Sequence, residues 1–301
     1  MAIQKKPFVS DKLAKRRKAA SKARKIVALV ILLIIISAAS YFTYAHRFFI
    51  KGVAVAGTQA VSAEEVTVAA ESEIAGLRII VPKRNIFFYP KNTIRENIAA
   101  AFPRLATVDA ELENYKLLIT VTEREPAYLW CGEQLPNTRQ ESFASSCYFV
   151  DDKGFIFSLA PQFSDSVYLK IYTTLAQSEN PIGKQAMSPD VLHNVAILAK
   201  EVTTQTFKPS AYSVTADGDA IIFLFRDSNA LPEIRYNPMH DPLIVASGFK
   251  TAMSTDPLKS KISSSFGLLE YIDLRFPNKV FYKFDTAVEQ SGEEATDAKP
   301  E

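Results

Sequence analysis

The feature that most constrains this chain is a run of 20 uncharged residues, 26–45, with the sequence IVALVILLIIISAASYFTYA. At 1.5 Å per residue, a helix of this length extends about 30 Å, which is the thickness of the hydrocarbon layer of a bilayer. A backbone in lipid must satisfy its own hydrogen bonds, so we expect one transmembrane helix. Tyr41, Phe42 and Tyr44 would then lie at the outer interface.

The charges on either side of this run predict its orientation. Residues 1–25 hold ten Lys or Arg and one Asp, a net charge of +9, whereas only Arg47 and Lys51 lie just beyond the other end. By the positive-inside rule the N-terminus is cytoplasmic and the chain from about residue 46 lies outside. A cleaved signal peptide is the competing interpretation, but its apolar stretch has only about 7–15 residues and its basic region is short. Both lengths favour an anchor.

The remaining charge pattern argues against nucleic acid as a partner. The whole chain of 301 residues has a net charge of +2, and its excess of positive charge lies in the N-terminal tail, where it serves topology. The central part is nearly neutral and offers no broad basic face. Residues 285–301 have a net charge of −5 and almost no large apolar side chains, so we expect a disordered tail that membrane insertion and partner binding do not need.

Residues 48–124 predict a first outer domain with the order strand, helix, helix, strand, strand. Val53 and Val55 alternate with small residues and lead to a turn at Gly57. Ser62 and Glu65 then form a capping box, which predicts the start of a helix.

The second half of this domain has equally clear signals. A helix begins near Asn92 and stops at Pro103, with Ile94, Ile98, Ala101 and Phe102 on one stripe. Two alternating strands follow, separated by a turn near Asn114. The residues expected on the inner face of these strands are Val108, Ala110, Leu112, Leu117, Ile119 and Val121.

Residues 126–284 predict a second outer domain that is rich in strands. Strands are expected at 127–130, in a hairpin over 147–157, and at 167–172, 211–216, 220–225, 232–236, 271–276 and 279–284. Ser188 and Asp241, each followed by proline, predict the starts of two helices. Apolar residues at helical spacing give the first of these helices a buried stripe, which comprises Val191, Leu192, Val195, Leu198, Ala199 and Val202.

Cys131 and Cys147 are predicted to form a disulfide. They end and begin strands that should be neighbours, and they lie outside the cytoplasm, where oxidation persists. Two free buried thiols are the alternative.

The sequence offers little that could support catalysis or metal binding. The three histidines, His46, His193 and His240, do not have ligand spacing, and no Gly-rich phosphate loop is present. The pair at residues 151–152 is better explained by turn formation in a hairpin than by catalysis. We therefore expect no catalytic residues, no metal, no cofactor and no small-molecule substrate; a membrane-anchored cell-wall hydrolase is the main alternative.

Several motifs, in this order, resemble the FtsQ/DivIB family of bacterial cell-division proteins. Residues 53–57 (VAVAG), 62–66 (SAEEV), 85–88 (NIFF), 102–103 (FP) and 121–127 (VTEREPA) resemble an FtsQ-type POTRA domain. Residues 149–154 (FVDDKG) and 271–275 (YIDLR) resemble the start and end of the family's β-domain. The fold that this implies is α+β: one N-terminal transmembrane helix, a β-α-α-β-β POTRA domain, and a mixed β-domain with two helices.

The resemblance implies a non-enzymatic scaffold of the divisome in the bacterial inner (plasma) membrane, at the division septum. Such a protein binds other single-span division proteins, FtsB and FtsL in particular, and helps to coordinate septal cell-wall synthesis. A POTRA-containing secretion or assembly component is a further alternative, although such proteins usually carry several POTRA repeats and a long barrel.

The partner-binding site is expected at the C-terminal edge of the second domain. A last strand exposes unpaired N–H and C=O groups to which a partner strand can add. The residues assigned to this site are Arg275, Phe276, Lys279, Val280, Phe281, Tyr282, Lys283 and Phe284. Alternate residues of the strand must face the core, so Phe281 and Tyr282 are expected on opposite faces. In the family, an Arg-aromatic pair like Arg275 and Phe276 lies near the partner site.

Overall fold

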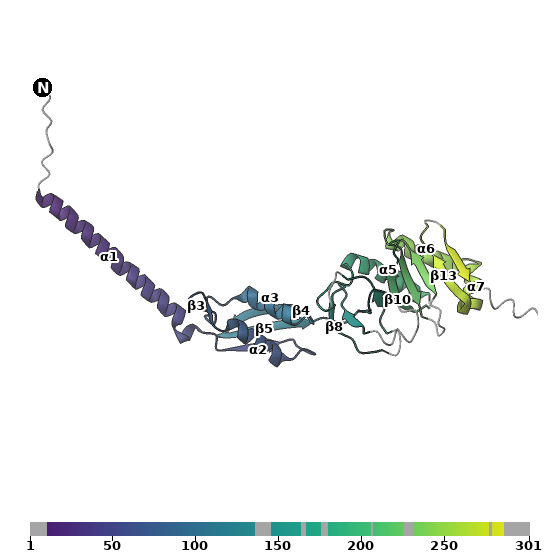
Figure 1. The fold of residues 1–301 in the computed structure, drawn as a ribbon, viewed down its shortest axis with the longest axis horizontal. Helices are drawn as coiled ribbons and strands as arrows, with labels where there is room; N and C mark the ends of the chain where they lie inside the picture. Colours follow the sequence, from purple (N-terminus) through teal and green to yellow (C-terminus); the bar gives the residue numbers. More distant parts are fainter. Residues whose placement is uncertain are drawn as a thin grey trace, which may run out of the picture. The chain divides into compact units, whose positions relative to one another are not determined.

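The structure, a computed structural model, describes residues 11–135, 146–163, 167–175, 180–205, 207–225, 232–276 and 279–285. The fold is mixed α+β, with one long apolar helix near the N-terminus (Figure 1). The chain divides into two compact units. One comprises Met1–Ala101 with Thr107–Thr122, and the other comprises Phe102–Ala106 with Glu123–Glu301. Apart from Asp285, the tail that the sequence predicts to be disordered lies outside the described residues.

The N-terminal helix α1 (Asp11–Tyr44) is longer than the predicted span, because the basic segment before residue 26 continues the same helix. Among the described residues, α1 is the one helix long and apolar enough to cross a bilayer. Its apolar side chains are exposed, as at Ile34, where 62% of the residue is accessible. A signal sequence near an N-terminus can also form a long apolar helix, so anchoring by α1 stays a prediction.

The first unit contains a three-stranded sheet in the order β1-β5-β4, in which β1 is parallel to β5. Its strands are β1 (Gly52–Ala56), β4 (Leu105–Glu113) and β5 (Lys116–Glu123). Two helices, α2 (Ala63–Ile74) and α3 (Lys91–Ala101), contribute the rest of the core. The buried hydrophobic residues of this unit are Ile50, Val66, Ala70, Ile74, Ile94, Ile98, Val108, Ala110, Leu117, Ile119 and Val121. The predicted strand, helix, helix, strand and strand follow one another in this unit, with a further short hairpin between the two helices.

Two local signals in this unit have clear physical causes. The Ser62 hydroxyl accepts a hydrogen bond from the Glu65 N–H at 3.4 Å, which confirms the predicted helix cap. At the end of β1, Gly57 has a φ of +92°, and a Cβ there would lie 2.0 Å from the Val121 carbonyl oxygen. Only glycine fits this turn.

Two details of the first unit differ from the predictions. Ala101 is exposed rather than part of the buried stripe, because α3 ends at that residue. A short hairpin, β2 (Leu77–Arg78) and β3 (Val81–Pro82), also lies between α2 and α3. Two-residue strands are too short to show an alternating pattern, so the sequence did not reveal this hairpin.

The second unit is built on a nine-stranded mixed sheet in the order β14-β13-β12-β11-β10-β9-β6-β7-β8. The strands are β6 (Tyr128–Trp130), β7 (Tyr148–Val150), β8 (Ile156–Leu159), β9 (Lys170–Tyr172), β10 (Pro209–Val214), β11 (Ala220–Leu224), β12 (Glu233–Tyr236), β13 (Leu269–Asp273) and β14 (Phe281–Phe284). The pairs β6–β9, β9–β10 and β12–β13 are parallel, and the other neighbours are antiparallel.

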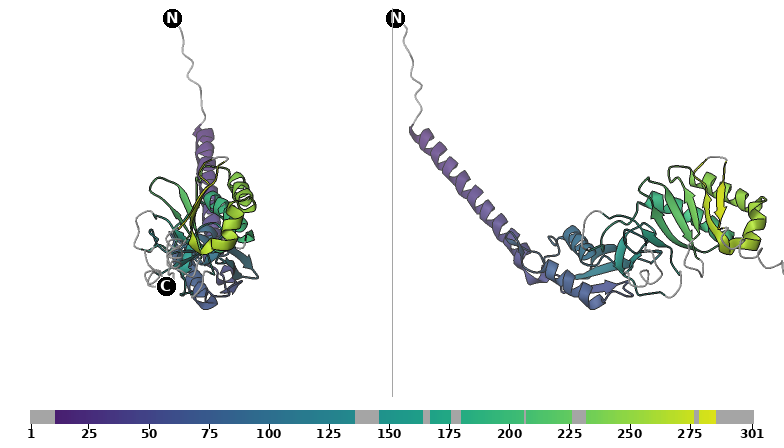
Figure 2. Two further views of the ribbon diagram at one scale, coloured as in Figure 1. Left: turned by 90° about the vertical axis from the view of Figure 1, so that its right-hand side faces the viewer. Right: turned by 45° about the vertical axis from the view of Figure 1, so that its right-hand side comes forward.

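Helices α5 (Pro189–Thr204) and α6 (Pro242–Ser254) pack against one face of this sheet (Figure 1, Figure 2). Ser188 and Asp241 cap them as predicted, accepting from the N–H groups of Val191 and Leu243. The shared core includes Tyr212, Ile222, Ile234 and Ile272 from the strands, Leu192, Val195, Leu198 and Val202 from α5, and Val245, Ala246, Phe249 and Met253 from α6.

The prediction of only two helices in this domain was wrong. A third helix, α7 (Leu258–Ser265), follows α6 and buries Leu258. Its sequence, LKSKISSS, is rich in serine and has only two apolar residues, Leu258 and Ile262, which is too short a pattern to predict a helix. Val191 is also more exposed than the predicted stripe of α5 required, at 36%.

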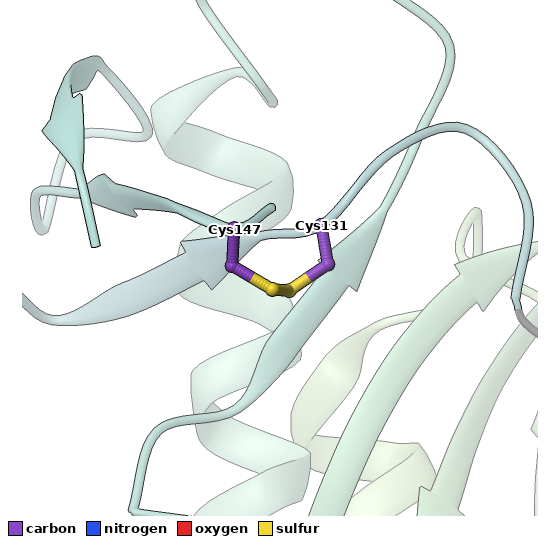
Figure 3. The surroundings of a disulfide bond; sticks show 2 residues. All are labelled: Cys131 and Cys147. Atoms are coloured by element: carbon purple, nitrogen blue, oxygen red, sulfur yellow. A yellow bond between two sulfur atoms is a disulfide. The ribbon is translucent and has the colours of Figure 1, made fainter. Parts of the chain in front are cut away.

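The opposite face of the sheet holds a second, smaller core beside the cysteines. It contains Leu129, Cys131, Ala160, Tyr172, Ala211 and Phe223. Cys131 and Cys147 are joined by a disulfide with an S–S distance of 2.04 Å (Figure 3). The bond connects the chain just after β6 to the chain just before β7, so it links two neighbouring strands of one sheet.

Candidate partner-binding surface

Strand β14 forms one end of the nine-stranded sheet. It pairs with β13 on one side, and none of the described strands pairs with its outer side. Backbone N–H and C=O groups on such an edge are available to a strand from another protein. The sheet therefore presents the kind of edge that the sequence predicted.

The pairing with β13 decides which residues of β14 face the core. Tyr282 lies opposite Ile272, which is completely buried, and Tyr282 packs with Val280 and Phe284 against the main core of the second unit. Phe281 and Lys283 point to the other face, where Phe281 is 49% exposed. The prediction that Phe281 and Tyr282 lie on opposite faces is confirmed, and the structure shows that Tyr282 is the inward one.

Two exposed phenylalanines form the apolar centre of this surface. The rings of Phe276 and Phe281 meet edge to face, with centroids 5.5 Å apart, and both residues are about half exposed. Paired aromatic rings bury a large area at little cost in side-chain entropy, which makes them effective anchors for a partner. They stand directly beside the free edge of β14.

Arg275 is engaged within the chain rather than free for a partner. Its guanidinium donates to the Asp273 carboxylate from Nε and from Nη2, at 3.0 and 2.7 Å, and to Asp219 from Nη1 at 2.8 Å. These hydrogen bonds raise the pKa of Arg275. They tie the end of β13 to the turn between β10 and β11, and the guanidinium carbon lies 5.8 Å from the ring of Phe276. Arg275 therefore positions Phe276.

The Asp273 carboxylate responds to the same network. Its burial acts to raise its pKa, but the hydrogen bonds and the charge of Arg275 outweigh that effect, and the pKa of Asp273 is lowered. The carboxylate is therefore held in its charged form beside β14.

The charged residues around the aromatic centre complete the surface. The Lys283 ammonium contacts the Glu270 carboxylate at 2.7 Å, which raises the pKa of Lys283. The Arg235 guanidinium lies 4.5 Å from the ring of Tyr271 and contacts Glu233 at 2.7 Å. Sequence reasoning did not include Glu270, Tyr271, Arg235 and Glu233, because their place on this face depends on the pairing of β12, β13 and β14. An apolar centre with a charged rim is typical of protein interfaces.

Two of the family-like motifs meet in the second unit in a structural role. Arg124 of the run 123–126 (EREP) pairs with Asp151, and its guanidinium carbon lies 4.1 Å from the ring centre of Phe155. The other Asp151 oxygen accepts from the N–H groups of Lys153 and Phe155, at 3.0 and 2.8 Å. The prediction that Asp151 forms a turn is confirmed.

The described residues show no arrangement suited to metal chemistry. Among them, no three His, Cys, Asp or Glu side chains come close enough to hold a metal ion. The most deeply buried tyrosine, Tyr212, is part of the core, and burial raises its pKa to about 12. The expectation of no cofactor and no catalysis remains a prediction.

Comparison with known proteins does not assign the chain to a family. No protein-family model matches it, and no curated protein matches its sequence significantly.

Proposed function

We propose that this chain is a non-enzymatic binding protein of the FtsQ/DivIB type, anchored in the bacterial plasma membrane by α1. The observation that carries the proposal is the free edge of β14 beside the exposed ring pair Phe276 and Phe281. The order of elements in the first unit and the motifs shared with the family support it. In this role the chain holds FtsB-like and FtsL-like division proteins at the septum and coordinates cell-wall synthesis there.

The binding mode that we propose is the addition of a strand. An extended segment of the partner pairs with β14 through main-chain hydrogen bonds, and its apolar side chains cover Phe276 and Phe281. Lys279 and Lys283 then lie at the rim, where charges contribute more to specificity and association rate than to affinity.

The test compares two neighbouring substitutions in the full-length chain. Phe281→Asp changes an exposed side chain, so we expect the second unit to stay folded and capture of an FtsB-like partner to weaken by at least about 30-fold, the effect of losing one strong anchor. Tyr282→Asp places a charge in the core, so we expect the second unit to unfold. Emission from Trp130, the one tryptophan of the chain, reports folding of that unit.

A matched control is available at the other end of the sheet. Leu159 of β8 is 59% exposed, so Leu159→Asp introduces the same charge at an exposed apolar position away from β14. This variant should capture the partner as the wild type does. If the Phe281→Asp and Leu159→Asp proteins both fold and both capture the partner at wild-type strength, the binding site is not at β14.

A further inference from the structure

The hairpin β2–β3 presents apolar side chains at its tip. Ile79 is 91% exposed and Ile80 is 69% exposed. Ile79 also has a φ of +61°, a conformation that a β-branched residue rarely adopts and that glycine or asparagine normally fills. A large apolar side chain that is almost fully exposed and has this unfavourable φ adds nothing to the core, which indicates a contact outside the fold.

The first unit holds this tip against the end of α1. The Tyr44 hydroxyl donates to the Ile80 carbonyl oxygen. Asn85, which is completely buried, donates from Nδ2 to the carbonyl oxygens of Phe42 and Thr43, at 2.8 and 3.1 Å. These are carbonyls of the last turn of α1, which have no partner within the helix. Strand β3 accordingly lies beside the end of α1 (Figure 1).

Aromatic rings continue the apolar surface from α1 to the same region. The Phe48 ring lies 5.2 Å from that of Phe42 and 5.6 Å from that of Phe87. Phe87 and Phe88 are 60% and 48% exposed. We call Ile79, Ile80, Phe87 and Phe88 the apolar tip.

The charged residues that flank the apolar tip in the sequence are all basic. Between Glu73 and Glu96 the sequence has five Lys or Arg and no Asp or Glu. Two of the five, Lys91 and Arg95, lie within 4 Å of Asp109. The other three, Arg78, Lys83 and Arg84, flank the tip in sequence, and Arg84 also donates from Nε to the Ile50 carbonyl oxygen at 2.8 Å. Apolar and aromatic side chains flanked by basic residues are typical of segments that bind the interface of an anionic membrane.

We propose that the apolar tip inserts into the outer interface of the bilayer that α1 spans and that Arg78, Lys83 and Arg84 contact anionic phospholipid headgroups. The end of a spanning helix must lie at that interface, and the contacts with Tyr44 and Asn85 hold the tip at the same level. This inference rests on α1 being an anchor, which is part of the proposed function.

The experiment measures contact with lipid from single tryptophans added to the full-length chain. The protein is reconstituted in vesicles of phosphatidylethanolamine and phosphatidylglycerol that contain brominated lipid, which quenches nearby tryptophan, and the emission of Trp130 in the wild type is the baseline. Ile79→Trp and the conservative Phe87→Trp report on the tip. Val68→Trp, at a 61% exposed position of α2, is the negative control, and Ile35→Trp, in the middle of the apolar run 26–45, is the positive control.

We expect the tryptophans at positions 79 and 87 to emit at shorter wavelength than the tryptophan at position 68. Brominated lipid should quench most of the emission that each tip tryptophan adds to that of Trp130, whereas the emission added by Val68→Trp should not be quenched. Quenching at the tip should weaken when phosphatidylcholine replaces phosphatidylglycerol. If Ile35→Trp is quenched but neither tip residue is, the insertion is refuted while the anchor stands. A tip tryptophan that is shifted but not quenched would mean that a second copy of the chain covers the tip, which also overturns the proposal. If Ile35→Trp itself is not quenched, the anchor fails and this inference fails with it.

Discussion

The substitution Asp151→Ala tests how much the contact between Arg124 and the turn at Asp151 stabilises the second unit. Asp151 follows β7, and its side chain is only 5% exposed. It accepts two N–H groups of its own turn and pairs with Arg124, whose side chain is 17% exposed. Alanine at this position would leave two turn N–H groups and a largely buried guanidinium without their acceptor.

The expected cost follows from these contacts. Each turn hydrogen bond contributes about 1 kcal/mol, and the charge-assisted bond to Arg124 contributes about 1.5–3 kcal/mol. Arg124 keeps its hydrogen bond to the Pro103 carbonyl oxygen and its contact with the Phe155 ring, which limits the loss. We therefore expect Asp151→Ala to lower the free energy of unfolding by about 3 kcal/mol, near the lower end for breaking a buried pair. Asp151→Asn retains an acceptor for the turn and should cost about half as much.

The assay is urea unfolding of the full-length chain in detergent micelles, followed by the emission of Trp130. With a slope of about 2 kcal/mol per molar urea, a loss of 3 kcal/mol lowers the midpoint by about 1.5 M. Arg124→Met removes the same ion pair from the other side, so the double variant should lose less than the sum of the two single losses. A loss below about 1 kcal/mol for Asp151→Ala, or full additivity, would refute the reasoning.

Three further predictions concern other parts of the fold. Gly57→Ala forces a Cβ against a backbone oxygen of β5 at a positive φ, so it should lower the stability of the first unit by about 2 kcal/mol or more, measured by hydrogen exchange; unchanged exchange would contradict this. Unreduced protein should show no alkylatable thiol at Cys131 or Cys147, and reduction should cost about 3 kcal/mol from loop-closure entropy; two alkylated thiols would disprove the pairing. Because Arg275 lowers the pKa of Asp273, the stability from this carboxylate is complete above its unfolded pKa of about 3.9 and is lost as the pH falls through the lower folded value. In Arg275→Met, burial still acts to raise the pKa of Asp273 and the charge of Arg235 still acts to lower it, but the hydrogen bonds and charge of Arg275 are lost. Acid unfolding followed by Trp130 emission should therefore begin at higher pH; identical acid midpoints would exclude this network.

The elements that the sequence predicted correctly have strong local causes. The caps Ser62, Ser188 and Asp241 satisfy backbone N–H groups within their own first turn, so their effect can be seen without knowledge of the fold. The alternating strands β4 and β5 bury one face as their pattern requires. By contrast, the hairpin β2–β3 is too short to show a period, and α7 has only two apolar residues at helical spacing, although Asp256 before it accepts from the Ser260 N–H. Neither element was predicted.

The sequence could predict the exposed strand β14 at the edge of the sheet, but not which of its side chains face outward. A period of two shows that Phe281 and Tyr282 face opposite ways, but only the pairing with β13 shows which one faces the core. The hydrogen bonds of Arg275 within the chain could not be predicted either, because Asp219, one of its two acceptors, is 56 residues away in sequence. The family-like pair of Arg275 and Phe276 thus indicated a surface whose use in binding stays a prediction, while the different contacts of its two members came from the tertiary structure.

The attachment of Asn85 to the last turn of α1 has a mechanical consequence. The short helix η1 (His46–Phe48) follows α1 after a single residue, and the side chain of Asn85 holds the carbonyls of Phe42 and Thr43. This junction therefore resists twisting, and a rotation of α1 about its own axis turns the rest of the first unit with it. In a membrane, the helices against which α1 packs would then determine the rotational orientation of the sheet and helices of the first unit about the membrane normal. If α1 packed against different helices, this orientation would change while the fold of the first unit stayed the same.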